Sequence, residues 1–321
     1  MSELPEISNR VAIIDCGTNT FNLLVADPTE GGWTAVHSAK LPVKIGEGSF
    51  EDKTIKAARF ARGLDALLAY KYTCQNYECS NVYAFGTSAL RDSINGPAFA
   101  EAAHKLIGVP LHIIGGDEEA DLIYQGVQLT YPIQAETVLI MDIGGGSTEF
   151  VIANADGVLW KHSFSIGVSR MYDTFKPSDP LQHQELTDIK KILRQDLAPL
   201  YEALHAFQPE RLIGSSGTFD TLLDLYYTGL NKEKPKDQVL HRIPVDVMKN
   251  INDRMITSTH EKRLTNKAIP EMRVQFMPMA CVLLDFVLHM RDFKEIIHSP
   301  YSLKEGALSR LLQAQAMSSG V

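Results

Sequence analysis

Two acidic residues flank a run of glycines in the segment Asp142-Ile-Gly-Gly-Gly-Ser-Thr-Glu149. Apolar stretches precede and follow this segment, which predicts a β-hairpin with its turn at the glycines. Glycine permits positive φ and a close approach of the backbone to a ligand, so the N–H groups of the turn can point at phosphate oxygens. Asp142 and Glu149 would then lie close enough to act on one Mg²⁺, directly or through water. The simpler interpretation is a tight hairpin with surface acids.

This segment belongs to residues 138–153, and the same pattern occurs earlier in the chain, in residues 11–26. A constant offset of 127, the difference between 142 and 15, aligns Asp15 with Asp142 and Gly17 with Gly144. The first copy has fewer glycines, and its further donors are the side chains of Thr18, Asn19 and Thr20. Two such turns facing each other would make a clamp for phosphate and a metal.

Gly214-Ser-Ser-Gly-Thr218 is a third candidate loop, because a strand, a glycine turn and a helix follow one another there. We expect Thr218 to cap that helix, and anions are favoured at a helix N-terminus. Turns from strand to helix commonly carry these residues, so this signal is weak by itself.

Acidic residues also gather in Ile114-Gly-Gly-Asp-Glu-Glu-Ala-Asp121, between the two repeats. Asp117 is expected to cap a helix whose first turn holds Glu118 and Glu119, where carboxylates are favoured. The segment has a simple interpretation as the start of a helix. At a junction between domains, an ionised carboxylate could instead act as general base toward a water molecule.

Strands alternate with helices along the chain, and the second half repeats the plan of the first, which predicts an α/β fold with mixed sheets. The length of 321 residues and the internal repeat both favour two domains. We expect the boundaries at 1–117, joined by a C-terminal helix at 301–321, and at 118–300. The predicted elements include helices over 54–72 and 184–207, strands over 81–86 and 109–114, and a strand with a glycine turn over 211–217.

Composition excludes several classes of function. The net charge of −8 argues against a general binder of nucleic acid or of anionic membranes. The longest strongly apolar stretch, residues 277–290, is too short to span a bilayer, and no apolar signal region opens the chain. Four unevenly spaced cysteines fit the reduced thiols of a cytoplasmic protein, and the pair Cys74 and Cys79 lacks the second pair of a zinc site.

Seven segments, taken together and in this order, resemble the exopolyphosphatase/guanosine pentaphosphate phosphohydrolase family. They are AIIDCGTNTFNLLV, FGTSALRDSIN, IGGDEEA, MDIGGGSTEFV, FSIGVSRMYDTF, LIGSSGTFDTL and YSLKEGAL, and they cover nearly the whole chain. This family is a branch of the superfamily of actin, hexokinase and the Hsp70 ATPase domain. The resemblance implies two ribonuclease-H-like (actin-like ATPase) domains with an interdomain cleft, and Mg²⁺-dependent hydrolysis of terminal phosphoanhydride bonds.

The resemblance also implies roles for individual residues. Glu119 matches the family's catalytic base, and Asp142 and Glu149 match its metal-associated and water-positioning acids. The phosphate-binding positions by the same match are Asp15, Gly17, Thr18, Asn19, Arg91, Gly144, Gly145, Gly146, Ser147 and Arg273. To these we add Ser216, Gly217 and Thr218, from the third candidate loop. The implied substrate is inorganic polyphosphate or guanosine pentaphosphate, and the resemblance suggests a homodimer.

The chain departs from the family pattern at several positions. Asn22, at the offset of 127 from Glu149, stands where many members have a basic or imidazole side chain. Ser215, Ser216 and Ser302 replace glycine or apolar residues, and Lys304 and Met279 replace arginine and glycine. The acids and the triple glycine are intact, so these changes bear on substrate choice more than on reaction type. Two alternatives stay open: an ATP-dependent kinase of the same superfamily, and a polyphosphate or nucleotide sensor with little turnover.

Overall fold

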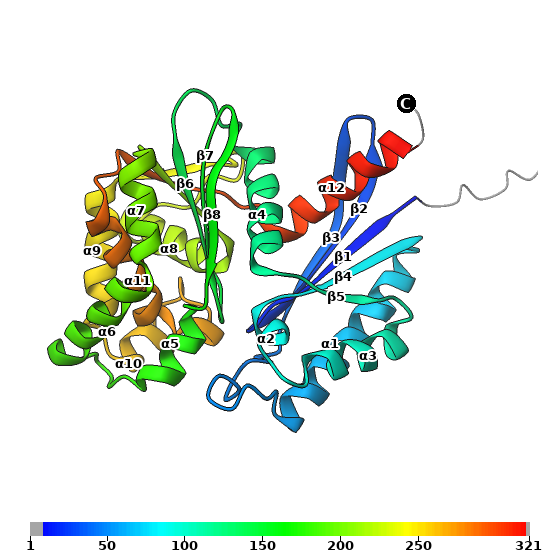
Figure 1. Ribbon diagram of the computed structural model, residues 1–321, viewed down its shortest axis with the longest axis horizontal. Coiled ribbons are helices and arrows are strands. Elements are labelled where there is room, and N and C mark those ends of the chain that lie inside the picture. Colours follow the sequence, from blue (N-terminus) through cyan, green and yellow to red (C-terminus); the bar gives the residue numbers. More distant parts are fainter. Residues whose placement is uncertain (1–8, 319–321) are drawn as a thin grey trace, which may run out of the picture. The chain divides into compact units, whose positions relative to one another are not determined.

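The computed structural model describes residues 9–318, which form two compact units. Unit 1 contains the residues up to Gly115 and those from Leu303 onward, and unit 2 runs from Gly116 to Ser302. Each unit is built around one mixed sheet with helices packed against it (Figure 1). The predicted α/β class is confirmed.

In the part of unit 1 that the structure describes, the sheet has the strand order β3-β2-β1-β4-β5. β1 pairs antiparallel with β2 and parallel with β4, β2 pairs antiparallel with β3, and β4 pairs parallel with β5. The strands are β1 (Val11–Cys16), β2 (Thr20–Thr29), β3 (Gly32–Pro42), β4 (Asn81–Gly86) and β5 (Leu111–Ile113). The helices are α1 (Ala57–Asn76), α2 (Ser88–Arg91), α3 (Gly96–Ile107) and α12 (Leu303–Ser318).

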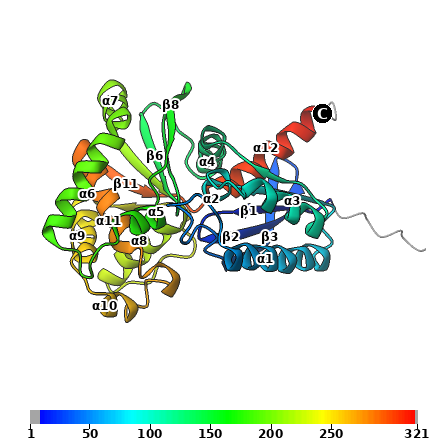
Figure 2. The ribbon, with the colours of Figure 1, turned by 60° about the horizontal axis from the view of Figure 1, so that its bottom comes forward.

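Both faces of this sheet are covered. Side chains alternate along a strand, so Ala12 and Ile14 join the core that includes residues of α1 and α3, while Ile13 points to the other face. Ile13 is nevertheless fully buried, and α12 contacts β1 and β2. Figure 2 shows α12 and α1 on opposite sides of the strands. Asp15 therefore belongs to the face that α12 covers.

In the described part of unit 2, the sheet has the order β10-β11-β9-β6-β7-β8. Its centre is formed by β6, which pairs antiparallel with β7 and parallel with β9. The strands are β6 (Val138–Ile143), β7 (Thr148–Asn154), β8 (Gly157–Phe164), β9 (Arg211–Ser215), β10 (His241–Ile243) and β11 (Glu295–His298). The helices are α4 (Gly116–Thr130), α5 (Val168–Phe175), α6 (His183–Asp196), α7 (Ala198–Phe207), α8 (Ser216–Gly229), α9 (Val245–Ile256), α10 (His260–Leu264) and α11 (Met277–Met290), with a 3₁₀ turn at Glu271–Arg273.

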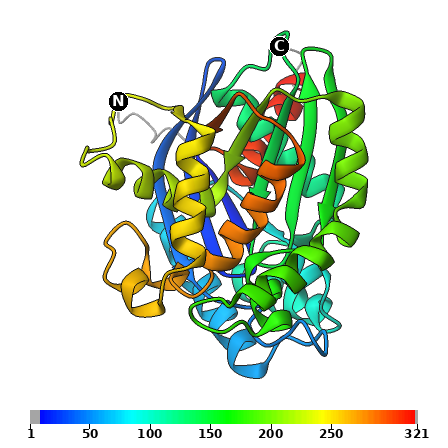
Figure 3. The same cartoon turned by 90° about the vertical axis from the view of Figure 1, so that its left-hand side faces the viewer.

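The faces of this second sheet differ in what covers them. Met141 and Phe150 point into a large core that includes residues of α6 to α9 and α11. Figure 3 looks from that side, with α9 in yellow and α11 in orange in front of the strands. The alternate residues of β6 and β7 point to the opposite face, where α4 contacts β7 and β8. Asp142 and Glu149 lie on this α4 side.

The long helix expected over 184–207 is wrong as a single element. α6 ends at Asp196 and α7 begins at Ala198, with Leu197 between them. Pro199 lies in the first turn of α7. A proline has no N–H to donate to the preceding turn and its ring clashes with that turn, so the helix breaks just before it. Among residues 9–318, no helix is both long and apolar enough to cross a membrane.

Gly126 of α4 packs directly against the backbone of Ser302, since a Cβ at this position would lie 2.0 Å from the Ser302 carbonyl oxygen. We expect Gly126→Ala to lower the melting temperature by several degrees, because overpacking of this kind costs about 1–3 kcal/mol. Gly229→Ala is the matched control, because nothing lies within 4 Å of its Cβ position. Thermal unfolding followed by circular dichroism measures both, and equal melting temperatures would contradict the expectation.

Candidate active site

The two glycine turns close in the same way, each within its own unit. The N–H of Gly17 donates to the carbonyl of Thr20 at 3.1 Å, and that of Gly144 donates to the carbonyl of Ser147 at 3.0 Å. A Cβ at either glycine would lie 2.9 Å from the oxygen it faces, and neither glycine has positive φ. A close approach of the backbone is therefore what requires glycine at these two positions, and the positive φ expected for the triple glycine is absent at Gly144. The sequence repeat is a repeat of structure.

The carbonyl groups of the second turn are bound by the start of α5. The Gly144 carbonyl accepts from the N–H of Val168, and the Gly145 carbonyl accepts from the N–H of Ser169. The Gly146 carbonyl accepts from Nε of Arg170 at 2.7 Å. Within residues 9–318, the N–H groups of Gly145 and Gly146 donate to no protein group. The turn thus offers two backbone donors to a ligand, the arrangement that binds anions in proteins.

The first turn is anchored by the segment that follows β3. The Asn19 carbonyl accepts from the N–H groups of Val43 and Lys44, and the Thr18 carbonyl accepts from the N–H of Gly46. This segment takes the place that α5 has in unit 2, so both turns are held through their carbonyl oxygens. Thr18 itself is buried.

The acid of each turn faces a different partner. Asp15 lies opposite Asn22 in the β1–β2 pairing, and the Asn22 side-chain amide donates to its Oδ2 at 2.8 Å. Asp142 lies opposite Glu149 in the β6–β7 pairing, so two carboxylates share one face of the sheet. Both are buried, with 5% of Asp142 and 2% of Glu149 exposed. The repeat therefore pairs an acid with an amide in unit 1 and with a second acid in unit 2.

Serine hydroxyls bind both acids of unit 2. Ser215 and Ser302 donate to Oδ2 of Asp142 at 2.8 and 2.5 Å, and Ser163 donates to Oε1 of Glu149 at 2.7 Å. Burial raises the pKa of Asp142, and the hydrogen bonds from the hydroxyls of Ser302, Ser216 and Ser215 lower it in part. The charged form of a buried carboxylate costs less when hydroxyl groups donate to it.

The acid pair suits Mg²⁺. This ion is usually held by one or two carboxylates together with water and substrate phosphate, and Asp142 and Glu149 supply two carboxylates side by side. Over the described residues there is no group of three or more His, Cys, Asp or Glu arranged to hold an ion. Asp142 and Glu149, beside the turn, are the residues that could hold such an ion.

Glu119 lies in the first turn of α4 and is 7% exposed. α4 packs on the sheet face that carries Asp142 and Glu149, so the three predicted catalytic acids belong to one side of one sheet. α4 begins at Gly116, and Asp117 consequently lies inside the helix instead of capping it. Its carboxylate still lies in the first turn, where the helix dipole favours it.

The third loop differs in detail from its prediction. α8 begins at Ser216, whose φ of 67° lies in the left-handed region, and Thr218 is already inside the helix. Thr218 does not cap the helix; its hydroxyl donates to the carbonyl of Ile143 at the end of β6. Gly217 faces the guanidinium of Arg273, because a Cβ there would lie 1.7 Å from Nη2. The loop therefore holds an arginine close to its backbone.

Arg273 is a half-buried cation in this arrangement. Its Nη1 donates to the hydroxyl of Thr221 at 2.6 Å, and burial lowers the pKa of its guanidinium. Arg91 in unit 1 donates through Nη1 to the carbonyl of Ile114 at 3.1 Å. Within unit 2 the structure thus gathers the acids, the triple glycine and the Arg273 loop around the end of β6. The remaining predicted residues, Asp15, Gly17, Thr18, Asn19 and Arg91, belong to unit 1.

The hydroxyl partners of Asp142 and Glu149 were not predicted from the sequence. Ser215 follows from the pairing of β9 with β6, where it lies beside Asp142, and Ser163 from the pairing of β8 with β7, where it lies beside Glu149. Both serines could have been predicted from the order and register of the strands. Ser302 lies 160 positions from Asp142 in the sequence, and no local pattern predicts the hydrogen bond between them.

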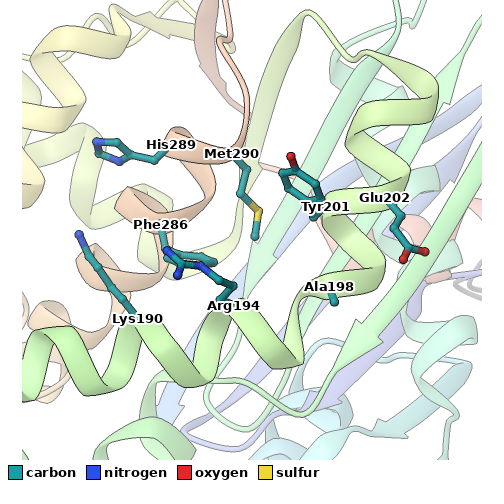
Figure 4. A pocket seen from close by; sticks show the side chains of 8 residues that line it. All are labelled: Lys190, Arg194, Ala198, Tyr201, Glu202, Phe286, His289 and Met290. Carbon is teal, nitrogen blue, oxygen red and sulfur yellow. The ribbon is translucent and has the colours of Figure 1, made fainter.

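Unit 2 also has a pocket that is separate from the predicted site residues. It has a volume of about 540 Å³, lies between α6, α7 and α11, and contains none of the predicted site residues (Figure 4). Phe286 and Met290 form part of its wall, and Arg194 and His289 come from the last turns of α6 and α11. Cations are favoured at helix C-termini, which accounts for Arg194 without a ligand.

Comparison with known proteins gives one consistent result. The model of the Ppx/GppA phosphatase family matches residues 24–315. A protein of Haemophilus influenzae, provisionally named an exopolyphosphatase, is 27% identical over 306 residues, which cover 94% of this chain and 91% of that protein. The crystal structure of an exopolyphosphatase from Cytophaga hutchinsonii is 32% identical, with a TM-score of 0.92 over 95% of this chain and 98% of its own. The Ppx/GppA family member of Aquifex aeolicus shares the fold, with 22% identity and a TM-score of 0.78 over 95% and 98% of the two chains.

Gly217→Ala tests whether the third loop and Arg273 bind anions. The new methyl group requires the end of a flexible side chain to move, so the fold should persist while the guanidinium is displaced. We expect binding of tripolyphosphate, measured by titration calorimetry, to weaken about 10- to 100-fold, because a hydrogen bond to a charged group is worth about 1.5–3 kcal/mol. Gly229→Ala again serves as control. Unchanged affinity in Gly217→Ala would remove this loop from the binding site.

Proposed function

Because this chain belongs to the Ppx/GppA phosphatase family, we propose that it hydrolyses the terminal phosphoanhydride bond of a phosphate chain. The pairing of Asp142 with Glu149 beside the glycine turn is the observation that carries the proposal. The two acids offer negative oxygens for a cation, and the glycine turn of the same hairpin offers N–H groups for phosphate. Hydrolysis of a highly charged substrate needs both kinds of group.

The glycine turn is proposed to bind the terminal phosphate group. The open N–H groups of Gly145 and Gly146 would donate to its oxygens, and the adjacent Ser147 adds a hydroxyl. Arg273 supplies a fixed positive charge near the end of β6. Donors that are already in place cost no reorganisation when charge develops on the reacting phosphate, and such electrostatic stabilisation is usually the largest contribution to catalysis.

Asp142 and Glu149 would hold Mg²⁺. When bound, the ion would neutralise phosphate charge, which is its usual contribution to phosphoryl transfer. The two acids need this partner, because two buried carboxylates that lie opposite each other repel.

Glu119 is proposed as the general base. Its carboxylate accepts a proton from a water molecule as the water oxygen bonds to the terminal phosphorus. The bridging P–O bond breaks, and the shortened chain leaves with the bridging oxygen. Burial of Glu119 and the position of α4 on the same sheet face as the acid pair support this role. The first turn, around Asp15 and Asn19, is proposed as a second phosphate-binding loop.

Inorganic polyphosphate is the proposed substrate. Two similar proteins carry the name exopolyphosphatase, one of them 32% identical over nearly the whole chain. Guanosine pentaphosphate presents the same kind of terminal phosphate, so it is the second candidate.

Glu119→Gln tests the base. The amide cannot take up the proton, so we expect phosphate release to fall about 10²- to 10⁴-fold, the usual contribution of general-base catalysis. Tripolyphosphate affinity should stay within a few-fold of the wild-type value. Glu118→Gln, in the same turn of α4 but exposed, is the control. Wild-type turnover in Glu119→Gln would rule out this role.

Substrate and metal are tested in one panel. Phosphate release is measured on long-chain polyphosphate, tripolyphosphate, guanosine pentaphosphate and ATP, each with Mg²⁺ and with EDTA. We expect the highest kcat/KM on long-chain polyphosphate, loss of activity in EDTA, and recovery when Mg²⁺ is restored. A preference for guanosine pentaphosphate would reassign the substrate, and full activity in EDTA would contradict the metal assignment.

A further inference from the structure

Besides Ser216, three serine hydroxyls each donate to one oxygen of a paired acid. Ser215 and Ser302 both donate to Oδ2 of Asp142, and Ser163 donates to Oε1 of Glu149. The donors come from three separate parts of unit 2, namely the end of β9, the residue before α12, and β8. Three distant segments therefore converge on a single pair of carboxylates.

The backbone fixes where each hydroxyl lies. Ser215 is paired with Asp142 in the parallel β6–β9 register, and Ser163 is paired with Glu149 in the antiparallel β7–β8 register. Ser302 is held by α4, where the absence of a side chain at Gly126 lets the two backbones touch. None of these donors depends on a long flexible side chain, so the carboxylate oxygens they bind are fixed in turn.

Ser215 and Ser302 are both departures from the family pattern. Compared with the family pattern, both look like losses of glycine or apolar residues. In the structure both hydroxyls donate to the same oxygen of the same buried acid. Two departures that look unrelated in the sequence thus act at one atom.

We propose that Ser163, Ser215 and Ser302 are positioning residues that set the affinity of unit 2 for a divalent cation. This inference rests on the proposed function, in which Asp142 and Glu149 hold Mg²⁺. A carboxylate that already has one oxygen tied down loses less side-chain freedom when it binds an ion. Partners of this kind, hydrogen-bonded to metal ligands, are typically worth 10- to 100-fold in metal affinity.

A purely structural role makes a different prediction. Hydroxyl donors also offset the cost of burying a carboxylate, and that would stabilise the fold without affecting an ion. Stability and cation affinity must therefore be measured separately. The metal is measured without substrate, so that turnover does not enter the result.

The experiment is Mn²⁺ binding to the full chain, followed by the electron paramagnetic resonance signal of free Mn²⁺. The double variant Ser215→Ala/Ser302→Ala should bind Mn²⁺ about 10- to 100-fold more weakly than the wild type. Ser302→Thr keeps a hydroxyl and should bind more tightly than Ser302→Ala. Thr130→Val is the matched control, because it removes the 2.9 Å hydroxyl pair between Thr130 and Ser299, beside the same segment, without touching either acid.

The outcomes separate this inference from the proposed function. If the wild type binds Mn²⁺, Asp142→Asn does not, and the double serine variant binds like the wild type, the serines have no positioning role and the metal site stands. If the wild type does not bind Mn²⁺, or Asp142→Asn binds equally well, the metal assignment and this inference both fall. Weaker binding in the double variant with normal binding in Thr130→Val supports the inference, provided that circular dichroism shows both variants folded.

Discussion

The strand pairing that sets Asp142 beside Glu149 is the constraint on which the rest of unit 2 depends. Like charges directly opposite each other in a sheet repel, and here the two carboxylates are buried as well. Such a pair needs compensation from its surroundings, and hydroxyl donors on both acids supply part of it. A bound cation would offset the repulsion that the hydroxyl donors leave. In unit 1 the same register places Asn22 opposite Asp15, and the amide satisfies the acid directly.

Both glycine turns are built on a second shared rule: their carbonyl oxygens are occupied by other parts of the protein. In unit 2 the start of α5 binds the carbonyls of the three glycines, and in unit 1 the segment after β3 binds those of Thr18 and Asn19. A peptide group whose oxygen is bound on one side presents its N–H elsewhere. An anion site can thus arise from ordinary backbone hydrogen bonding, with no cation in the turn itself.

The two hairpins and the acid pair could be predicted from the sequence, because each depends on residues that lie close together along the chain. The offset of 127 predicted two equivalent hairpins, and both turns close with the same hydrogen bond. The spacing of Asp142 and Glu149 predicted their proximity, since a hairpin with a short turn leaves little choice of register. The features that were not predicted depend on contacts between residues far apart in the sequence, or on local details of the backbone. Ser302 meets Asp142 only through the packing of α4, and Pro199 divides a helix whose apolar periodicity continues across the break.

The place of α12 in the sequence has a consequence for the order in which the two units can fold. α12 covers the face of β1 and β2 that carries Ile13, yet it follows the whole of unit 2 in the sequence. Unit 2 is one continuous stretch, from Gly116 to Ser302, and is complete before α12 has been synthesised. Since domains generally fold as units during synthesis, the first unit to begin is the second to finish. The apolar face of β1 and β2 therefore stays uncovered by α12 until all of unit 2 has been synthesised.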